Sequence, residues 1–522
     1  MDSETRAADP AEIKATVYSW YVLSILVLLY ILNFIDRQVL TILAVDLKAD
    51  LHIEDSDFGF LYGTAFGVFY ALFGVPLGRL ADNWHRIRLM TIGLSLWSMM
   101  TALSGLSKNL IQLAGARIGV GIGEATAGPS AYSLISDYFP KHQRATAIAI
   151  YTSGLYLGGG LSLFIGGAIV EYWNVTYPDH SGPLGLAGWQ AAFMAVGLPG
   201  LLLAVWISTL REPVRGRFDG LVTGRHPRPF GVFFEDLASI IPPFTLIGAS
   251  RRGANAVVMN LAVAALIGLV VYGMVEWTGD WLQWTAVGIG VYAVVSWAIA
   301  LKHNDPPAFQ LIWGTPAFLY VVVGYGLVAF NAYAVSAFAP AYAIQTFNTA
   351  PDATGFFLGG AGAAGGAIGV ILGGFMADRF RKTNAAGRIV VALIGAVGPI
   401  IPFVVSFTTG SATLYYALHL PMVLLSSSAL GASAATIVDL VLPRMRGTAT
   451  AAFFIGTTLI GLSLGPYIAG KISEVTGDLA TGMLSILAVA PISIIALLLA
   501  YRAVPEAAAT IVERAKAAGE PI

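Results

Sequence analysis

A succession of apolar runs, each about 20 residues long and separated by short polar segments, most constrains what this chain can become. A helix of that length crosses the hydrocarbon core of a bilayer. Only 11% of the 522 residues are charged and 57% are hydrophobic, whereas soluble proteins carry about 25% charged residues. We therefore predict an all-α membrane protein. The expected spans, about fourteen, lie near 18–43, 57–80, 89–107, 110–138, 145–171, 189–210, 255–277, 281–301, 313–345, 354–378, 388–408, 411–439, 447–471 and 479–501.

The connections between these runs alternate in charge. One set is basic and the other is acidic or neutral, and because positive residues stay inside, the sequence predicts cytoplasmic termini and a multi-pass protein of the inner (plasma) membrane. The basic set contains Arg79/Arg86/Arg88, Lys141/Arg144, Arg211/Arg215/Arg217/Arg225/Arg228, Arg379/Arg381/Lys382 and Arg444/Arg446. The acidic or neutral set contains Asp46 to Asp57, Glu171 to Asp179, Glu276 to Asp280, and Asp352.

Two short motifs occur twice, once in each half of the chain. Gly78-Arg-Leu-Ala-Asp82-Asn-Trp-His-Arg86 matches Gly374-Phe-Met-Ala-Asp378-Arg379-Phe-Arg381. Asp137 to Arg144 likewise matches Asp439 to Arg446. Internal repetition of membrane segments is typical of secondary transporters. We expect one six-helix bundle at 1–210, a second at 311–522, and a connecting segment at 211–310.

The connecting segment is expected to hold a cytoplasmic stretch and an extra transmembrane hairpin. Apolar residues from Phe230 to Ile241 fit helical spacing, so this stretch is either a helix lying on the membrane surface or an irregular loop. The hairpin, 255–301, has acidic residues only at its outer turn, Glu276 and Asp280. Because no buried polar group is evident in it, we interpret the hairpin as scaffolding at the edge.

Four ionisable residues fall inside apolar spans: Asp36, Arg37, Arg117 and Glu124. A charge at the bilayer centre costs about 2.5–3.5 kcal/mol on insertion scales, so such residues pair or face a wet cavity. Counted along helices that run in opposite directions, Asp36 and Arg117 lie at similar depth. Glu124 lies two turns further along the same face as Arg117, close to the midplane.

These positions suggest proton coupling. A carboxylate that meets an arginine in one conformation and apolar surface in another takes up and releases a proton. We expect Asp36 and Glu124 to carry the coupling, with Arg37 and Arg117 as partners or as binders of an anionic group. The alternative is a static ion network that fixes helix packing.

The second half offers no buried charge in its candidate cavity spans, 313–345 and 411–439, but it offers hydroxyl and amide groups. This asymmetry suits an amphipathic substrate. The expected substrate-binding residues are Asn33, Arg37, Arg117, Glu124, Tyr325, Asn331 and Tyr333. We interpret His419 as a packing residue because its neighbours are apolar.

The repeated basic turns are expected to form a cytoplasmic gate. Asp82 and Asp378 precede helix N-termini, where carboxylates are favoured, and Arg86 and Arg379 can pair with them or with a neighbouring helix. A plain topology signal is the alternative. The gate residues are therefore predicted as Asp82, Arg86, Asp378 and Arg379.

Several function classes are disfavoured. The chain has no cysteine, no phosphate-binding glycine loop with lysine, and no zinc-like histidine spacing, so we expect no cofactor, no metal and no catalytic residue. A net charge of −1 argues against nucleic acid. The expected partners are the bilayer, protons and a small amphipathic or anionic substrate, bound by a monomer.

The two turns, Gly78-x-Leu80-Ala81-Asp82-x-x-x-Arg86 and Ala377-Asp378-Arg379-x-Arg381, resemble the loop motif of the major facilitator superfamily. Asn33-Phe-Ile-Asp36-Arg37 and Arg117-Ile-Gly-Val-Gly-Ile-Gly-Glu124 are similar to the Spinster family of lysophospholipid and sphingosine-phosphate transporters, in a bacterial-looking form. The resemblance implies two six-helix bundles and a proton-linked polar cluster of Asp36, Arg117 and Glu124. Asn83, His85 and the extra hairpin depart from the superfamily pattern.

The expected function is secondary active transport of an amphipathic anionic solute, lysophospholipid- or sphingolipid-like, by alternating access with proton coupling. The first alternative is a proton-coupled symporter or exporter of small organic anions or drugs. A membrane receptor on the same scaffold is a further alternative, and an enzyme is the weakest.

Overall fold

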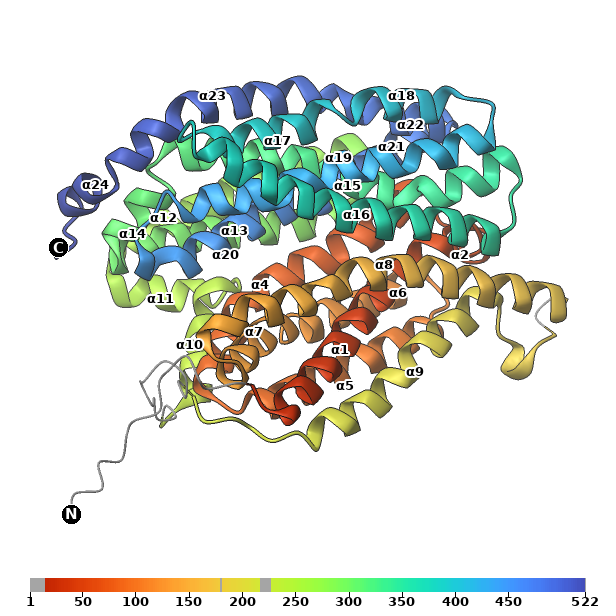
Figure 1. Ribbon diagram of the computed structural model, residues 1–522, viewed down its shortest axis with the longest axis horizontal. Helices are drawn as coiled ribbons and strands as arrows, with labels where there is room; N and C mark the ends of the chain where they lie inside the picture. Colours follow the sequence, from red (N-terminus) through yellow and green to blue (C-terminus); the bar gives the residue numbers. More distant parts are fainter. Residues whose placement is uncertain (1–14, 179–180, 216–226, 522) are drawn as a thin grey trace, which may run out of the picture.

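The computed structural model describes residues 15–178, 181–215 and 227–521. Of the residues named above, Asp179, Arg217 and Arg225 lie outside these ranges. Within the described ranges the regular elements are helices, and they gather into two bundles that lie against each other (Figure 1).

The first bundle contains the elements up to residue 208, drawn from red to yellow in Figure 1. They are α1 (Val17–Ile42), α2 (Ala44–Leu51), α3 (Asp55–Gly59), the π-helical η1 (Phe60–Thr64), α4 (Ala65–Asn83), α5 (Arg86–Ser104), α6 (Leu110–Glu124), α7 (Ala127–Tyr138), α8 (Lys141–Thr176), η3 (Pro183–Gly185) and α9 (Gly188–Ser208).

The second bundle begins at residue 316 and is drawn from green to blue. It contains α15 (Pro316–Phe347), α16 (Pro351–Arg381), α17 (Gly387–Val397), α18 (Ile400–Thr408), α19 (Ala412–Val438), η4 (Pro443–Met445), α20 (Arg446–Thr457), η5 (Thr458–Leu462), α21 (Gly465–Thr476), α22 (Leu479–Ser485), η6 (Ile486–Val489), α23 (Ala490–Ala509) and α24 (Ile511–Ala517).

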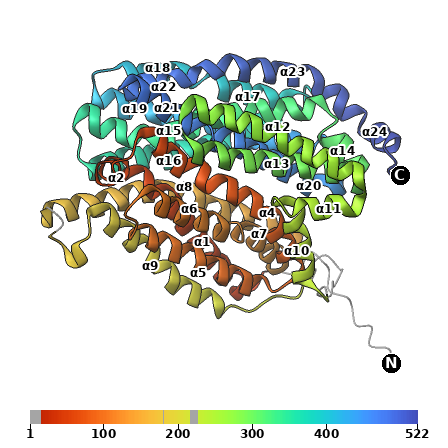
Figure 2. The same ribbon diagram turned by 180° about the vertical axis from the view of Figure 1, so that it is seen from behind.

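Between the bundles the chain forms five more helices. They are α10 (Pro229–Ile240), α11 (Thr245–Arg252), α12 (Ala254–Thr278), α13 (Trp281–Asn304) and α14 (Pro306–Ile312). Figure 2 shows α12 and α13 in front of the second bundle, seen from behind.

Thirteen helical segments of the described chain are long and apolar enough to cross a membrane, and a bent pair, α10 with α11, raises the number to fourteen. The expected span at 110–138 is not among them because it is broken into α6 and α7 at Ala125 and Thr126. Pro129 lacks an N–H and cannot bond the carbonyl four residues earlier, which explains why the helix is interrupted there. Thirteen of the fourteen expected spans are therefore confirmed as single apolar segments, and the expected span at 110–138 consists of two helices instead of one.

The stretch from Phe230 to Ile240 is helical, so the alternative of an irregular loop is wrong there. Helix α10 meets α11 at 92°. Phe230 packs edge-on against Trp84 with ring centroids 5.0 Å apart, and Phe233 packs against the apolar cluster of Leu77, Leu80 and Ala81. Helix α10 is thus attached to the end of α4 in the first bundle.

The extra hairpin differs from its expected description because it holds buried polar groups. Asn260 of α12 and Ser296 of α13 are both buried, and the serine hydroxyl donates to the Asn260 amide oxygen at 3.0 Å. Gln283 is buried too, and its amide donates to the Ser463 carbonyl of the second bundle at 3.1 Å. Helix α13 also packs on α4 of the first bundle. The interpretation of a hairpin without buried polar groups is therefore wrong.

Hydrogen bonds join the two bundles. They lie far from the two repeated turns, which precede α5 and α17. We call the end of the molecule with those turns, with α10, α11 and α24, the basic face, and the end with α2 the opposite face (Figure 1). Ser56 donates to Glu474 at 2.5 Å, Ser473 donates to Asp55 at 2.6 Å, and Thr64 donates to the Ser463 carbonyl at 2.8 Å. These contacts close the opposite face.

Glycines allow close helix contact between the bundles. Helices α8 and α16 run side by side where the bundles meet (Figures 1 and 2). A Cβ built on Gly359 would lie 2.5 Å from the Gly160 carbonyl oxygen, and one on Gly167 would lie 2.4 Å from the Pro351 carbonyl oxygen. Small residues at such points let backbones approach in a membrane.

Candidate functional site

A cavity of about 320 Å³ lies between the two bundles. The first bundle contributes α1 and α8, and the second contributes α15, α16, α17, α18, α19, η6 and α23. Leu163, Val328, Val335, Phe403 and Met422 give much of the wall its apolar character. Among the described residues that line the cavity, Arg37 is the single aspartate, glutamate, lysine or arginine.

Arg37 lies at the cavity wall and is also paired behind it. Its Nη2 donates to Glu124 Oε2 at 2.7 Å, and its side chain is 14% exposed, whereas that of Glu124 is fully buried. The guanidinium carbon lies 4.4 Å from the centre of the Phe66 ring and 5.1 Å from that of Tyr70. These aromatic faces, together with the ion pair, fix the orientation of the guanidinium.

Arg117 and Asp36 complete the buried group. Both are fully buried, and Arg117 Nη1 donates to the backbone carbonyl of Asp36 at 3.3 Å. The Asp36 carboxylate interacts electrostatically with Glu124 and with Arg117. Asn33, one turn before Arg37, is buried as well. Helices α1 and α6 therefore bring together all four of the ionisable residues that the sequence places in apolar spans.

The expected substrate-binding residues divide into two groups. Arg37, Tyr325, Asn331 and Tyr333 line the cavity. Asn33, Arg117 and Glu124 do not line it and lie behind Arg37. Sequence reasoning missed Gln38, Tyr62 and Ser336, which lie between the cavity and the opposite face. Uncharged polar residues are common in membrane helices, and the spacing of these three along the chain does not indicate that they meet.

Those residues form a hydroxyl–amide triad of Gln38, Tyr62 and Ser336. The Tyr62 hydroxyl lies 3.2 Å from Gln38 Oε1 and 3.1 Å from Ser336 Oγ, and Ser336 Oγ lies 3.2 Å from Gln38 Oε1. Gln38 and Ser336 also line the cavity. The triad joins α1 and η1 of the first bundle to α15 of the second, directly beside Arg37.

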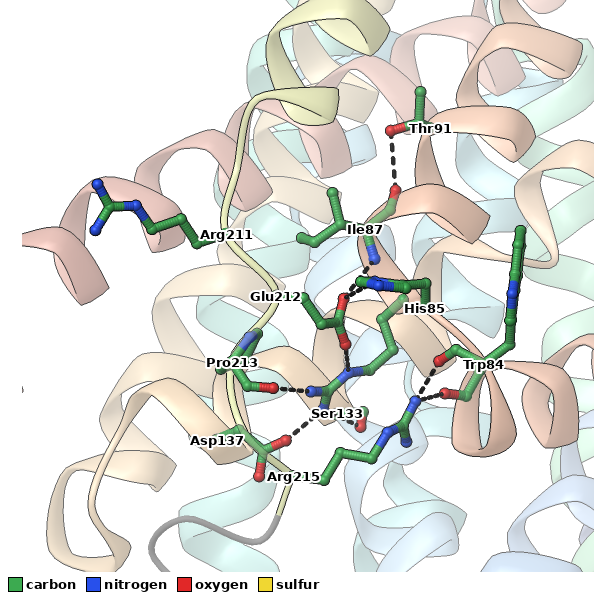
Figure 3. A network of polar contacts seen from close by, with 12 residues as sticks. Trp84, His85, Ile87, Thr91, Ser133, Asp137, Arg211, Glu212, Pro213 and Arg215 are labelled. Atoms are coloured by element: carbon green, nitrogen blue, oxygen red, sulfur yellow. Dashed lines mark hydrogen bonds and ion pairs between the residues drawn. The ribbon is translucent and has the colours of Figure 1, made fainter. Parts of the chain in front are cut away.

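The first repeated turn is held by the buried side chain of Arg86, whose partners Ser133, Asp137, Glu212 and Pro213 are labelled in Figure 3. Arg86 Nε donates to Glu212 Oε1 at 2.7 Å, Nη1 donates to Ser133 Oγ at 2.8 Å and to the Asp137 carboxylate, and Nη2 donates to the Pro213 carbonyl at 3.2 Å. Arg215 donates to the backbone carbonyls of Ala81 and Trp84. The segment after α9 thereby locks the start of α5.

Glu212 has its charge stabilised at this turn. Burial by itself would raise the pKa of the Glu212 carboxyl, but the Ile87 N–H, which donates to it at 3.0 Å, and the Arg86 guanidinium outweigh burial and hold that pKa below its ordinary value.

The second repeated turn uses Arg388 where the sequence predicts Arg379. Arg388 Nη2 pairs with Asp378 at 3.0 Å, and Nη1 pairs with Asp439, which also accepts from Arg381. Arg379 is exposed, and Asp82 is exposed in the first turn. Arg388 stands near the start of α17 as Arg86 stands at the start of α5. The position of Arg388 near a helix start could have indicated its role from the sequence. The three basic residues Arg379, Arg381 and Lys382 lie closer to Asp378 in the chain and were the more obvious candidates.

The two repeated motifs are thus linked pairwise. In each bundle the arginine at the start of the helix that follows the first motif's aspartate, Arg86 of α5 or Arg388 of α17, pairs with the aspartate of the second motif, Asp137 or Asp439. Both networks lie on the basic face, and each of the ion pairs named here joins residues on the same side of the boundary between the bundles.

The model of the Major Facilitator Superfamily matches residues 26–459. The chain belongs to this superfamily. With its thirteen apolar helices long enough to cross a membrane among the described residues, it is a multi-pass membrane transporter of this superfamily.

Within the superfamily the chain resembles the Spinster family. It is 25% identical over 481 residues to protein spinster homolog 1 of Xenopus tropicalis, covering 88% of this chain and 74% of that protein. It is 27% identical over 466 residues to an MFS-type efflux pump of Mycolicibacterium smegmatis, covering 88% and 86%. Over 221 residues it is 28% identical to a probable galactarate/D-glucarate transporter of Bacillus subtilis, covering 41% and 45%.

The fold agrees with solved structures of a bacterial homologue to the human lysosomal transporter Spinster. The inward-facing, unoccupied form has a TM-score of 0.67 and 24% identity, covering 96% of this chain and 99% of that one. The inward-facing, occupied form has a TM-score of 0.64 and 25% identity, covering 97% of each chain.

Proposed function

We propose that this chain moves an amphipathic anionic solute, of the lysophospholipid or sphingolipid type, by alternating access, and that the movement is coupled to protons. The observation that carries the proposal is the double role of Arg37, which faces the cavity and holds Glu124 at 2.7 Å. One guanidinium is thus within reach of both a bound anion and a buried carboxylate.

Competition for this guanidinium supplies the coupling. An anion that enters the cavity draws Arg37 away from Glu124. An unpaired, buried carboxylate is costly, so Glu124 takes up a proton when it loses its partner. Anion and proton are then bound together, and they leave together when the ion pair forms again. Asp36 and Arg117 lie against this pair and shape its electrostatic field.

The walls of the cavity support an amphipathic solute rather than a fully polar one. Arg37 offers a single site for an anionic group, while leucine, valine, phenylalanine and methionine side chains from both bundles bury an apolar one. The names of two relatives, an efflux pump and a galactarate/glucarate transporter, favour the alternative of drugs or small organic anions. A sugar acid has no apolar part to fill this wall, so we place that alternative second.

Purified protein in proteoliposomes with an internal pH-sensitive dye tests the proposal. Lysophospholipids and short carboxylates are added one at a time. A proton movement that follows a lysophospholipid supports the proposal, and a response confined to short carboxylates supports the alternative. No solute-dependent proton movement with any compound contradicts both.

Replacing Glu124 tests its role directly. Glu124→Gln removes the proton carrier and the competitor for Arg37, so we expect proton-driven uptake to fall about tenfold or more while the solute binds at least as tightly as before. Glu276→Gln is the matched control, because Glu276 is an exposed acid at the end of α12. Unchanged proton-driven uptake by a folded Glu124→Gln protein refutes the role of Glu124.

A further inference from the structure

We propose that the cavity holds a second polar subsite opposite Arg37, formed by His419 of α19 and Asn331 of α15, which binds an uncharged hydrogen-bonding group of the solute. The solute is then an anion with a hydroxyl or similar group separated from its charge by an apolar stretch. This inference rests on the proposed function, because it takes the cavity to be the binding site.

Two unsatisfied polar atoms carry the inference. His419 is 7% exposed, and its Nδ1 has no hydrogen-bond partner among the described residues. The Asn331 side-chain oxygen, also buried, has none either within that part of the chain. Both residues line the cavity. Buried polar groups are nearly always hydrogen-bonded, so two such atoms at the wall of one cavity point to a ligand that bonds them.

The hydroxyl groups nearby do not share this property. Ser426 and Ser427 also line the cavity, but each donates to a carbonyl of its own helix, Val423 at 3.1 Å and Leu424 at 3.2 Å respectively. Their donors are already used. His419 and Asn331 therefore gain more from a hydrogen-bonding solute than these two serines do.

The packing of α15 places this subsite at the depth of Arg37. The Tyr415 hydroxyl donates to the Ala339 carbonyl at 2.9 Å, so one turn further along the antiparallel α19, His419 lies level with Val335. The neighbouring Ser336 contacts Gln38 at 3.2 Å, and Gln38 follows Arg37 in the chain. Arg37 and His419 thus face the cavity at similar depth from different bundles, and a solute that reaches both lies across the cavity.

A series of fatty acids provides the probe. Binding to the purified protein is measured for octanoate, decanoate and dodecanoate and for their ω-hydroxy forms. We expect at least one hydroxy acid to bind about fivefold or more tightly than its plain counterpart, because the hydroxyl satisfies atoms that an alkyl end leaves unpaired. The chain length with the largest preference reports the separation of the two subsites.

Variants assign the preference to its residues. His419→Leu and, as a second variant, Asn331→Leu are expected to abolish the preference while plain acids bind as well or better. Ser426→Ala is the control, and we expect it to retain the preference. A preference at no chain length, or one that survives in a folded His419→Leu protein, overturns the inference. If no acid of either kind binds, the proposed function fails instead.

Discussion

At the scale of single residues, the chemistry of this protein depends on arginines that have more than one possible partner. Arg37 lies between Glu124 and the cavity, and Arg86 lies between Glu212 and Asp137. A planar guanidinium with several donors suits such sharing, which a lysine would not reproduce. The difference between the two lies in access, because the cavity reaches Arg37 and leaves Arg86 fully buried.

The Arg86 network gives a pH-dependent contribution to stability. Glu212→Gln removes a charge-assisted pair, and we expect it to lower the melting temperature of the detergent-solubilised protein by a few degrees at pH 7, for a loss of about 1–2 kcal/mol. The folded pKa of Glu212 lies below its unfolded value. The contribution is therefore complete above the unfolded pKa, about 4.3, and is lost as the pH falls through the folded pKa.

Melting curves of the wild type and Glu212→Gln between pH 7 and pH 3 check this expectation, with the exposed Glu235→Gln as control. The difference between wild type and Glu212→Gln should shrink at the acidic end. A difference that stays constant across the range contradicts the assignment.

At the scale of elements, prolines and glycines decide where helices end and how closely they pack. Pro129 interrupts the expected span at 110–138, which leaves Glu124 at the end of α6, where Arg37 of α1 meets it. Glycines decide the contact of α8 with α16, because a side chain there would overlap the facing backbone. Their spacing predicts close contact, but the sequence does not say which helix is the partner.

Two adjacent glycines of α16 test this packing. Gly359→Ala places a Cβ 2.5 Å from the Gly160 carbonyl, whereas Gly360→Ala meets nothing within 4 Å. We expect Gly359→Ala to destabilise the protein by about 1–3 kcal/mol and Gly360→Ala to be neutral or slightly stabilising, since alanine favours helix. Thermal unfolding in detergent measures both, and equal effects of the two changes contradict the packing described.

At the scale of the whole molecule, the bundles are joined on the opposite face, whereas the Arg86 and Arg388 ion pairs described on the basic face each hold one bundle together. Cross-bundle contacts near the opposite face run from Ser56–Glu474 to the Gln38–Tyr62–Ser336 triad beside the cavity. The alternating access that we propose requires these contacts to break as the basic face closes. The hairpin contacts both bundles. Gln283 donates to the Ser463 carbonyl of the second bundle, and α13 packs on α4 of the first.

A crosslink tests the need for this opening. The chain contains no cysteine, so in a Ser56→Cys/Glu474→Cys variant a thiol reagent reacts with the two introduced cysteines alone. The two native side chains lie 2.5 Å apart, and a short thiol crosslinker should join the cysteines and abolish transport, with recovery in a cleavable version after reduction. Each single cysteine variant is the control. Full transport by the crosslinked protein contradicts the requirement.

The sequence by itself determined the helical class, the approximate number of spans and the four ionisable residues that had to find partners. Apolar length and the cost of charge in lipid are local properties that a sequence displays directly. Only the tertiary structure decided that Glu124 pairs with Arg37, that Arg388 replaces Arg379 at the second turn, and that His419 and Asn331 reach the same cavity. Those outcomes depend on which helix faces meet, because hydrogen bonds and ion pairs act over a few ångströms between segments far apart in the chain.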